Sequence, residues 1–195
     1  MSIFILLLAL VVWGIVHSFL ATHFAKGIFR IKYGNMDFYR LAYNLFAAIS
    51  FLPILYWMAA LPNQVFYQIS APWSYLMLGG QLFSALMLGL AFLQTDALSF
   101  VGLRQLFDKE NTDGLVTRGL YRLVRHPLYT FGLLFIWLSP TVTQNSITVY
   151  AGATVYTLVG AYFEERKLLR DYGEAYAEYQ RNTPMLIPGF ILGRK

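Results

Sequence analysis

Residues 3–20 read IFILLLALVVWGIVHSFL, an apolar run that contains no formally charged residue. A helix needs about 20 predominantly apolar residues to cross the hydrocarbon core of a bilayer. Two further runs of that length, Leu41–Leu61 and Trp73–Leu93, follow in the first half of the chain. The sequence therefore predicts that residues 1–100 form a membrane region of three spanning helices.

Two more apolar segments lie in the second region, residues 101–195. Leu128–Leu138 is about half a span long, and Ile147–Phe163 follows it after a short polar turn. We interpret this pair as a helical hairpin, which brings the expected number of membrane segments to about five. The predicted fold class is all-α, a polytopic membrane helical bundle.

The tail from Glu164 to Arg181 is predicted to be one amphipathic helix on the cytoplasmic side. Apolar and aromatic residues recur in it at steps of three and four, as on one face of a helix: Leu168, Leu169, Tyr172, Tyr176 and Tyr179. Pro184 and Pro188 follow the pattern and end it.

The composition supports a membrane protein. Hydrophobic residues make up 57% of the 195 residues and charged residues only 13%, against about 25% in an average soluble domain. The chain contains no cysteine, which excludes disulfides, thiolate metal sites and a cysteine nucleophile. We expect no metal centre.

The distribution of positive charge predicts the orientation of the chain. All 15 Lys and Arg residues fall in residues 26–40, 104–125 and 166–195, and the loops between these segments carry none. The positive-inside rule places the three basic segments in the cytoplasm and the N-terminus outside, and we expect a bacterial inner membrane. The net charge of +5 then reflects contact with anionic headgroups, and no nucleic-acid partner is expected.

Polar residues gather first at Arg122, Arg125 and His126, directly before Pro127. Their spacing predicts that the three basic side chains lie within one helical turn. A proline suits the first position of a helix, so the fourth membrane helix should begin there. Its N-terminal amides and partial positive charge favour the binding of a carboxylate or phosphate.

Glu164 and Glu165 form a second polar cluster, at the end of the predicted fifth segment. Two adjacent carboxylates beside a membrane are costly if buried, so we expect a partner, either a cationic ligand or Arg125. Simpler interpretations remain for both clusters. The arginines would then only snorkel to the headgroups, His126 would only cap a helix, and the glutamates would form a solvated helix face.

Four motifs occur in a fixed order between residues 114 and 189: Arg125-His126-Pro127-Leu128-Tyr129, Glu164-Glu165-x-x-Leu168, Tyr172-Gly173-x-x-Tyr176-x-x-Tyr179 and Pro184-x-x-x-Pro188. This set resembles the integral-membrane methyltransferases, a superfamily that includes isoprenylcysteine carboxyl methyltransferase and the phospholipid methyltransferases. Residues 100–105, 139–143 and 184–188 resemble its methanethiol S-methyltransferase branch. Residues 16–21 and 39–44 resemble the same branch, and they also resemble the bacterial NnrU-like proteins.

The resemblance implies S-adenosylmethionine as the methyl donor and a catalytic region in residues 101–195. It implies that Arg125 and Glu165 are catalytic and lie nearest the acceptor. It also implies a cofactor pocket lined by Val116, Gly119, His126, Pro127, Tyr129 and Glu165.

The chemistry of the donor is compatible with these residues. Its carboxylate suits a helix N-terminus with His126, and its amino group suits Glu164 or Glu165. Its sulfonium cation suits an aromatic ring, for which the sequence offers Tyr129, Tyr162 and Tyr172.

The sequence leaves the acceptor open among a small thiol, a prenylcysteine carboxylate and another membrane-soluble molecule. Two other classes of protein remain as alternatives. A nicotinamide-dependent membrane reductase would use the Arg-His-Pro element to bind a phosphate, and a non-catalytic membrane scaffold would bind neither cofactor.

Overall fold

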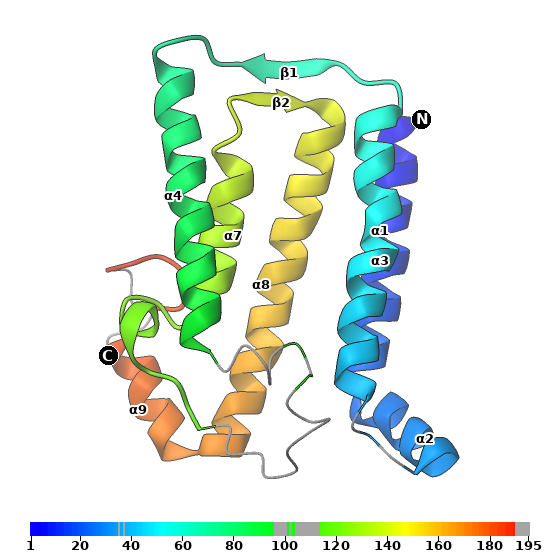
Figure 1. The fold of residues 1–195 in the computed structure, drawn as a ribbon, viewed down its shortest axis with the longest axis vertical. Coiled ribbons are helices and arrows are strands. Elements are labelled where there is room, and N and C mark those ends of the chain that lie inside the picture. The colour runs from blue at the N-terminus through cyan, green and yellow to red at the C-terminus, as the bar shows by residue number, and fades with distance from the viewer. Residues whose placement is uncertain (35, 37, 96–100, 102, 104–113, 190–195) are drawn as a thin grey trace. The chain divides into compact units, whose positions relative to one another are not determined.

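The computed structural model describes residues 1–34, 36, 38–95, 101, 103 and 114–189 (Figure 1). These residues form two compact units. One contains residues 1–66 and 143–152, and the other contains residues 67–95, 114–142 and 153–189. The predicted boundary at residue 100 adjoins residues 96–100, which lie outside the described part.

The first unit is built around α1 (Ser2–Ala21) and α3 (Tyr39–Ala60). Leu6 of α1, Ile54 of α3 and Val149 form its buried core. Inside this helix pair, the indole Nε1 of Trp13 donates a hydrogen bond of 2.9 Å to Ser50 Oγ. Such polar contacts between apolar helices satisfy groups that a bilayer would leave unpaired.

A short helix, α2 (His23–Tyr33), follows α1 in the first basic segment, between the first two predicted spans, where no helix was predicted. The Thr22 hydroxyl caps its N-terminus by accepting a hydrogen bond of 3.2 Å from the Ala25 amide. Gly34 ends it with a φ of 70°, a conformation that favours glycine.

The second unit packs α4 (Trp73–Gln94) against α7 (Pro127–Trp137). Gly80 permits a close approach there, because a Cβ atom at this position would lie 2.6 Å from Leu138 Cδ1. Gln81 Nε2 donates a hydrogen bond of 2.9 Å to the Phe135 carbonyl in the same contact. As predicted, α7 begins at Pro127.

Two helices replace the single tail helix that we predicted. Helix α8 runs from Gln144 to Tyr172, and α9 runs from Glu174 to Asn182. Gly173 separates them with a φ of 55°, which L side chains rarely adopt. The prediction of a continuous helix was therefore wrong at this glycine, whereas α9 ends before Pro184, as predicted.

The all-α prediction also missed a small sheet. Strands β1 (Val65–Gln68) and β2 (Thr141–Thr143) pair with each other. The segment Thr141-Val142-Thr143 is β-branched throughout, which favours an extended backbone. Proline at position 140 likewise disfavours a helix before it.

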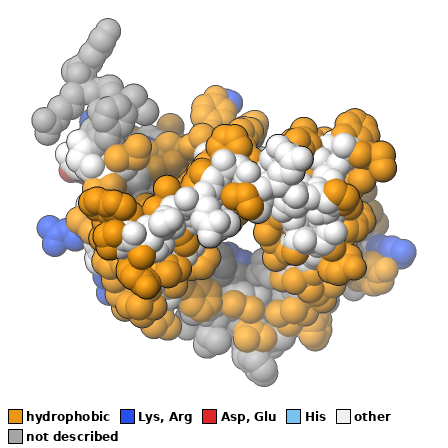
Figure 2. Space-filling model, turned by 90° about the horizontal axis from the view of Figure 1, so that it is seen from above, with side chains coloured by type: hydrophobic (Ala, Val, Ile, Leu, Met, Phe, Trp, Pro, Cys, Tyr) orange, Lys and Arg blue, Asp and Glu red, His pale blue; other side chains and the backbone are white. Residues whose placement is uncertain are grey.

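Three helices are long and apolar enough to cross a membrane: α1, α3 and α4. They coincide with the first three predicted spans. Helix α7 is apolar but has only 11 residues, so the fourth and fifth segments stay predictions. Large hydrophobic side chains are exposed on all three long helices, and in the view from above, in Figure 2, hydrophobic side chains lie mainly toward the outside. This is the surface expected of a chain solvated by lipid.

Candidate functional site

The Arg125-His126-Pro127 segment is held by the residues that follow α9. A short 3-10 helix, η1 (Gly119–Arg122), precedes it, and exposed Arg122 ends that helix. The amides of Arg125 and His126 then donate hydrogen bonds of 2.8 and 3.1 Å to the carbonyls of Pro184 and Met185. The prediction that the three basic residues share one helical turn was therefore wrong, because this stretch pairs with the tail instead.

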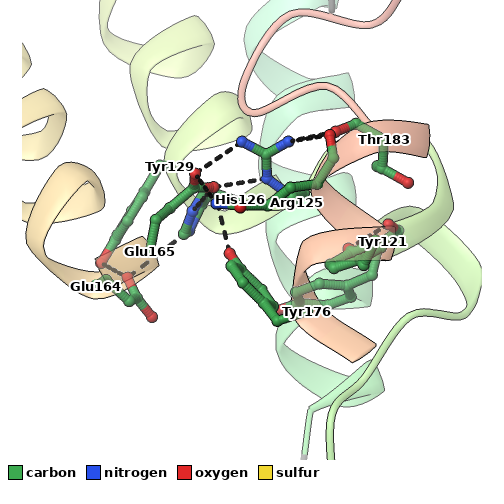
Figure 3. Close-up of polar contacts among 10 residues, drawn as sticks. Tyr121, Arg125, His126, Tyr129, Glu164, Glu165, Tyr176 and Thr183 are labelled. Carbon is green, nitrogen blue, oxygen red and sulfur yellow. Dashed lines mark hydrogen bonds and ion pairs between the residues drawn. The ribbon is translucent and has the colours of Figure 1, made fainter. Parts of the chain in front are cut away.

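Arg125 and Glu165 form an ion pair between the start of α7 and the end of α8. Arg125 Nε lies 2.6 Å from Glu165 Oε1, and Nη2 lies 2.8 Å from Oε2. The other terminal nitrogen, Nη1, donates to the carbonyls of Gln180 and Thr183 (Figure 3). Arg125 thus ties α8 to the end of α9 with four of its five N–H donors.

Three more side chains converge on the Glu165 carboxylate. His126 Nε2 lies 3.0 Å from Oε1, and the Tyr176 hydroxyl donates to the same oxygen at 3.3 Å. Gln180 Nε2 donates to Oε2 at 2.9 Å. The carboxylate therefore has donors on both oxygens, and only 13% of its side chain is exposed.

These contacts set the charge state of Glu165. Burial alone disfavours the charged form, but hydrogen bonds from His126 and Arg125, with their charges, outweigh it and lower the pKa of Glu165 to about 2. Burial of the Tyr176 hydroxyl, together with the nearby Glu165 charge, raises the pKa of Tyr176. Tyr176 is therefore a neutral hydrogen-bond donor, and Glu165 is a carboxylate at every physiological pH.

Glu164, the preceding residue, is much more open. Its Oε2 accepts a hydrogen bond of 2.8 Å from the Tyr129 hydroxyl and lies 3.7 Å from His126 Nδ1. The side chain is 43% exposed, against 13% for Glu165. The rings of His126 and Tyr129 stack beside it, with centroids 5.3 Å apart. Of the two carboxylates, Glu164 is the one accessible to a ligand.

Tyr121 and Tyr179 extend the cluster. The Tyr179 hydroxyl donates a hydrogen bond to the Tyr121 carbonyl, which joins α9 to η1. Burial and the Glu164 charge raise the pKa of Tyr121 to about 12. We did not predict roles for Tyr121, Gln180 or Thr183, and only the Tyr176-x-x-Tyr179 spacing hinted that α9 faces the site.

Gly119 and Val116 lie on the segment that leads to η1. Gly119 has a φ of 64°, and a Cβ there would clash with the side chain of Gln94, whose Oε1 accepts a hydrogen bond of 2.7 Å from the Leu120 amide. Glycine is therefore required at this position for structural reasons. Within the described ranges, no hydrogen bond or ion pair joins Gly119 or Val116 to the glutamate cluster.

The residues present fit a cofactor that carries an amino group and a sulfonium cation. Glu164 offers an accessible carboxylate, and the Tyr129 ring, which stacks on the buried His126 ring, offers an aromatic face beside it. Tyr162, an alternative aromatic partner, lies instead under the Arg166 guanidinium, 5.8 Å from it, on exposed α8 surface.

Residues 75–175, slightly more than half of the chain, match the family model of the phospholipid methyltransferases. None of the solved structures matches the chain. Among known proteins, methanethiol S-methyltransferase 2 of Bradyrhizobium diazoefficiens is 29% identical, over 100% of this chain and 76% of that protein.

Two further relatives share shorter segments. A methanethiol S-methyltransferase of Mycobacterium tuberculosis is 32% identical, over 76% of this chain and 63% of that protein. A cobalt-zinc-cadmium resistance protein of Cupriavidus metallidurans is 38% identical, over 44% of this chain and 40% of that protein. The chain thus spans less than two thirds of the length of these two relatives. The family match includes Arg125, His126 and both glutamates, and the chain belongs to the phospholipid methyltransferase family.

Proposed function

We propose that this chain is an S-adenosylmethionine-dependent membrane methyltransferase whose acceptor is a small thiol. The carrying observation is the contrast between two adjacent carboxylates, Glu165 saturated by protein donors and Glu164 accessible beside stacked aromatic rings. The relatives named methanethiol S-methyltransferase support a thiol over a prenylcysteine carboxylate or another membrane-soluble acceptor.

When bound, the cofactor supplies an electrophilic methyl group on a sulfonium cation. Glu164 would hold its amino group, and the Tyr129 ring, which stacks on His126, would face the cation, where a desolvated cation–π contact contributes about 2 kcal/mol. Val116, Gly119 and Pro127 would line the rest of the pocket. Groups held in position before the reaction would favour alignment of donor and acceptor.

Arg125 and Glu165 position the site in this proposal. Their ion pair holds the end of α8 against α9, and the backbone of Glu165 fixes where Glu164 projects. One N–H of Arg125 Nη2 has no partner among the described residues. That donor and its charge would favour a thiolate acceptor, which is the nucleophilic form of a thiol.

The proposed orientation places this site at the cytoplasmic face of a bacterial inner membrane, with the N-terminus outside. The positive-inside rule supports it, because the basic residues of segments 104–125 and 166–195 flank both halves of the cluster. A membrane-soluble acceptor would then reach the site laterally from the bilayer.

Calorimetry of the detergent-purified chain tests the cofactor directly. S-adenosylhomocysteine should bind the wild type and bind Glu164→Gln at least about tenfold more weakly, as expected when a charge-assisted hydrogen bond is lost. Glu178→Gln, on the exposed surface of α9, is the matched control and should bind normally. Binding of a reduced nicotinamide dinucleotide instead would support a membrane reductase, and binding of neither would support a scaffold.

A further inference from the structure

One continuous stripe of α8 changes from apolar to basic along its length. Residues at helical spacing of three and four share a face, and this stripe consists of Val155, Val159, Phe163, Arg166, Lys167 and Arg170. All six side chains are exposed, for example 61% of Val155 and 62% of Phe163. The stripe therefore presents an apolar track that ends in three cations.

A shallow groove lies at the change from apolar to basic. Phe163, Arg166, Lys167 and Arg170 line it, and its volume is about 410 Å³. Its lining combines one aromatic side chain with three cationic ones. A ligand that complements this groove carries a negative charge next to an apolar part.

The positive charge of the groove is only partly compensated. Arg170 Nε lies 3.3 Å from Asp171 Oδ1, and the Arg166 guanidinium lies over the Tyr162 ring. Among the residues that the structure describes, no carboxylate pairs with Arg166 or Lys167. The groove thus keeps a net positive charge for a ligand.

The groove lies on the other side of α8 from the methyltransferase site. At 100° per residue, the midpoint of Glu164 and Glu165 falls opposite the stripe. The structure agrees, since both glutamates contact α7 side chains or residues that precede it, whereas Arg166 and Lys167 are exposed. A ligand in the groove would therefore leave Glu164 accessible.

We propose that this groove binds the phosphate headgroup of an anionic phospholipid, with an acyl chain along Val155, Val159 and Phe163. A free phosphate ion would satisfy the cations but would leave the apolar track uncovered, so the continuous stripe favours a lipid. Each cation near an anionic surface strengthens the binding of a negatively charged headgroup. The bound lipid would hold the end of α8, which carries the two glutamates, at the level of the headgroups. The proposal does not depend on the methyltransferase assignment.

Native mass spectrometry of the detergent-purified chain tests it, with phosphatidylglycerol or phosphatidylcholine added. The wild type should retain phosphatidylglycerol in preference to phosphatidylcholine, and an excess of inorganic phosphate should not displace it. The variant Arg166→Gln/Lys167→Gln/Arg170→Gln should retain at most about one tenth of the phosphatidylglycerol that the wild type retains.

The control Arg30→Gln/Lys32→Gln/Arg181→Gln removes a closely matched set of exposed cations. In it, too, one cation lies over a tyrosine ring (Lys32 and Tyr33) and one pairs with a carboxylate (Arg181 and Glu174). It should retain phosphatidylglycerol like the wild type. An equal loss in both triple variants would show attraction by net charge alone and would overturn the site.

Two further results would also overturn it. Displacement by inorganic phosphate would identify a soluble anion as the ligand, and equal retention of both lipids would remove the headgroup. If the triple variant does not fold, Lys167→Gln carries the test, because its exposed side chain has no ion pair within the described part of the chain. It should reduce retention severalfold, and wild-type retention would contradict the proposal.

Discussion

The guanidinium of Arg125 and the carboxylate of Glu165 are joined by two hydrogen bonds, of 2.6 and 2.8 Å, with only 10% and 13% of the side chains exposed. The two residues are 40 positions apart, and their pair connects the segment before α7 to the end of α8. Further bonds from the same guanidinium reach the end of α9 and the tail. The site is therefore assembled around this nearly buried ion pair.

Removing one partner of this pair should destabilise the fold. Glu165→Ala leaves the Arg125 charge uncompensated in a nearly buried position, which typically costs about 3 kcal/mol. Denaturant unfolding of the detergent-solubilised protein should show a loss of that size. Glu178→Ala, on the exposed face of α9, should unfold like the wild type, and equal losses in the two variants would argue against a buried role for Glu165.

The same carboxylate predicts how stability depends on pH. Folding lowers the pKa of Glu165 from 4.5 to about 2, so its contribution is fully present above about pH 4.5 and is lost as the pH falls toward 2. The difference in unfolding free energy between the wild type and Glu165→Gln should therefore be constant above about pH 5 and shrink below it. A difference that does not change down to about pH 3 would show that the pKa is not lowered.

Arg125→Lys separates positioning from simple anchoring in the headgroups. Lysine also snorkels, so an anchoring role predicts an unchanged protein. It can keep an ion pair with Glu165 but cannot at the same time offer the remaining N–H of Nη2 to the acceptor, so a role in positioning the acceptor predicts a fall in turnover of about a hundredfold with nearly unchanged affinity for S-adenosylhomocysteine. Both quantities are to be measured on one folded preparation. Wild-type turnover would remove Arg125 from the catalytic residues.

The proposed orientation can be tested with single cysteines, since the chain contains none. Gln68→Cys and Gln144→Cys should react with an impermeant maleimide added outside intact cells, and Glu178→Cys should react only after permeabilisation. All three side chains are exposed. Labelling of Glu178→Cys from outside would contradict a cytoplasmic site.

Sequence patterns were sufficient for the long helices, because a span of about 20 apolar residues has few other solutions. Helix α2, the break at Gly173 and the β1–β2 pair were missed. Each depends on a local conformation or pairing that hydrophobic periodicity does not report. Helix α2 is short, Gly173 adopts a positive φ, and β1 pairs with a strand more than 70 residues away.

The candidate site was predicted in part. Charge complementarity made Arg125 an expected partner for the two glutamates, and the structure shows that it pairs with Glu165. The contrast between Glu164 and Glu165 could not be predicted, because neighbouring identical residues differ only in the partners that folding brings to them. The carbonyls of Gln180 and Thr183 likewise have no signature in the sequence, since every residue carries one.

Transfer of a tritiated methyl group from S-adenosylmethionine to methanethiol, by the purified chain in liposomes, tests the central claim most directly. A prenylcysteine and a lipid amine serve as competing acceptors. The account predicts a labelled thioether from the wild type and Glu178→Gln, and a strongly reduced yield from Glu164→Gln. A wild-type protein that binds no S-adenosylhomocysteine and labels none of the acceptors would contradict it.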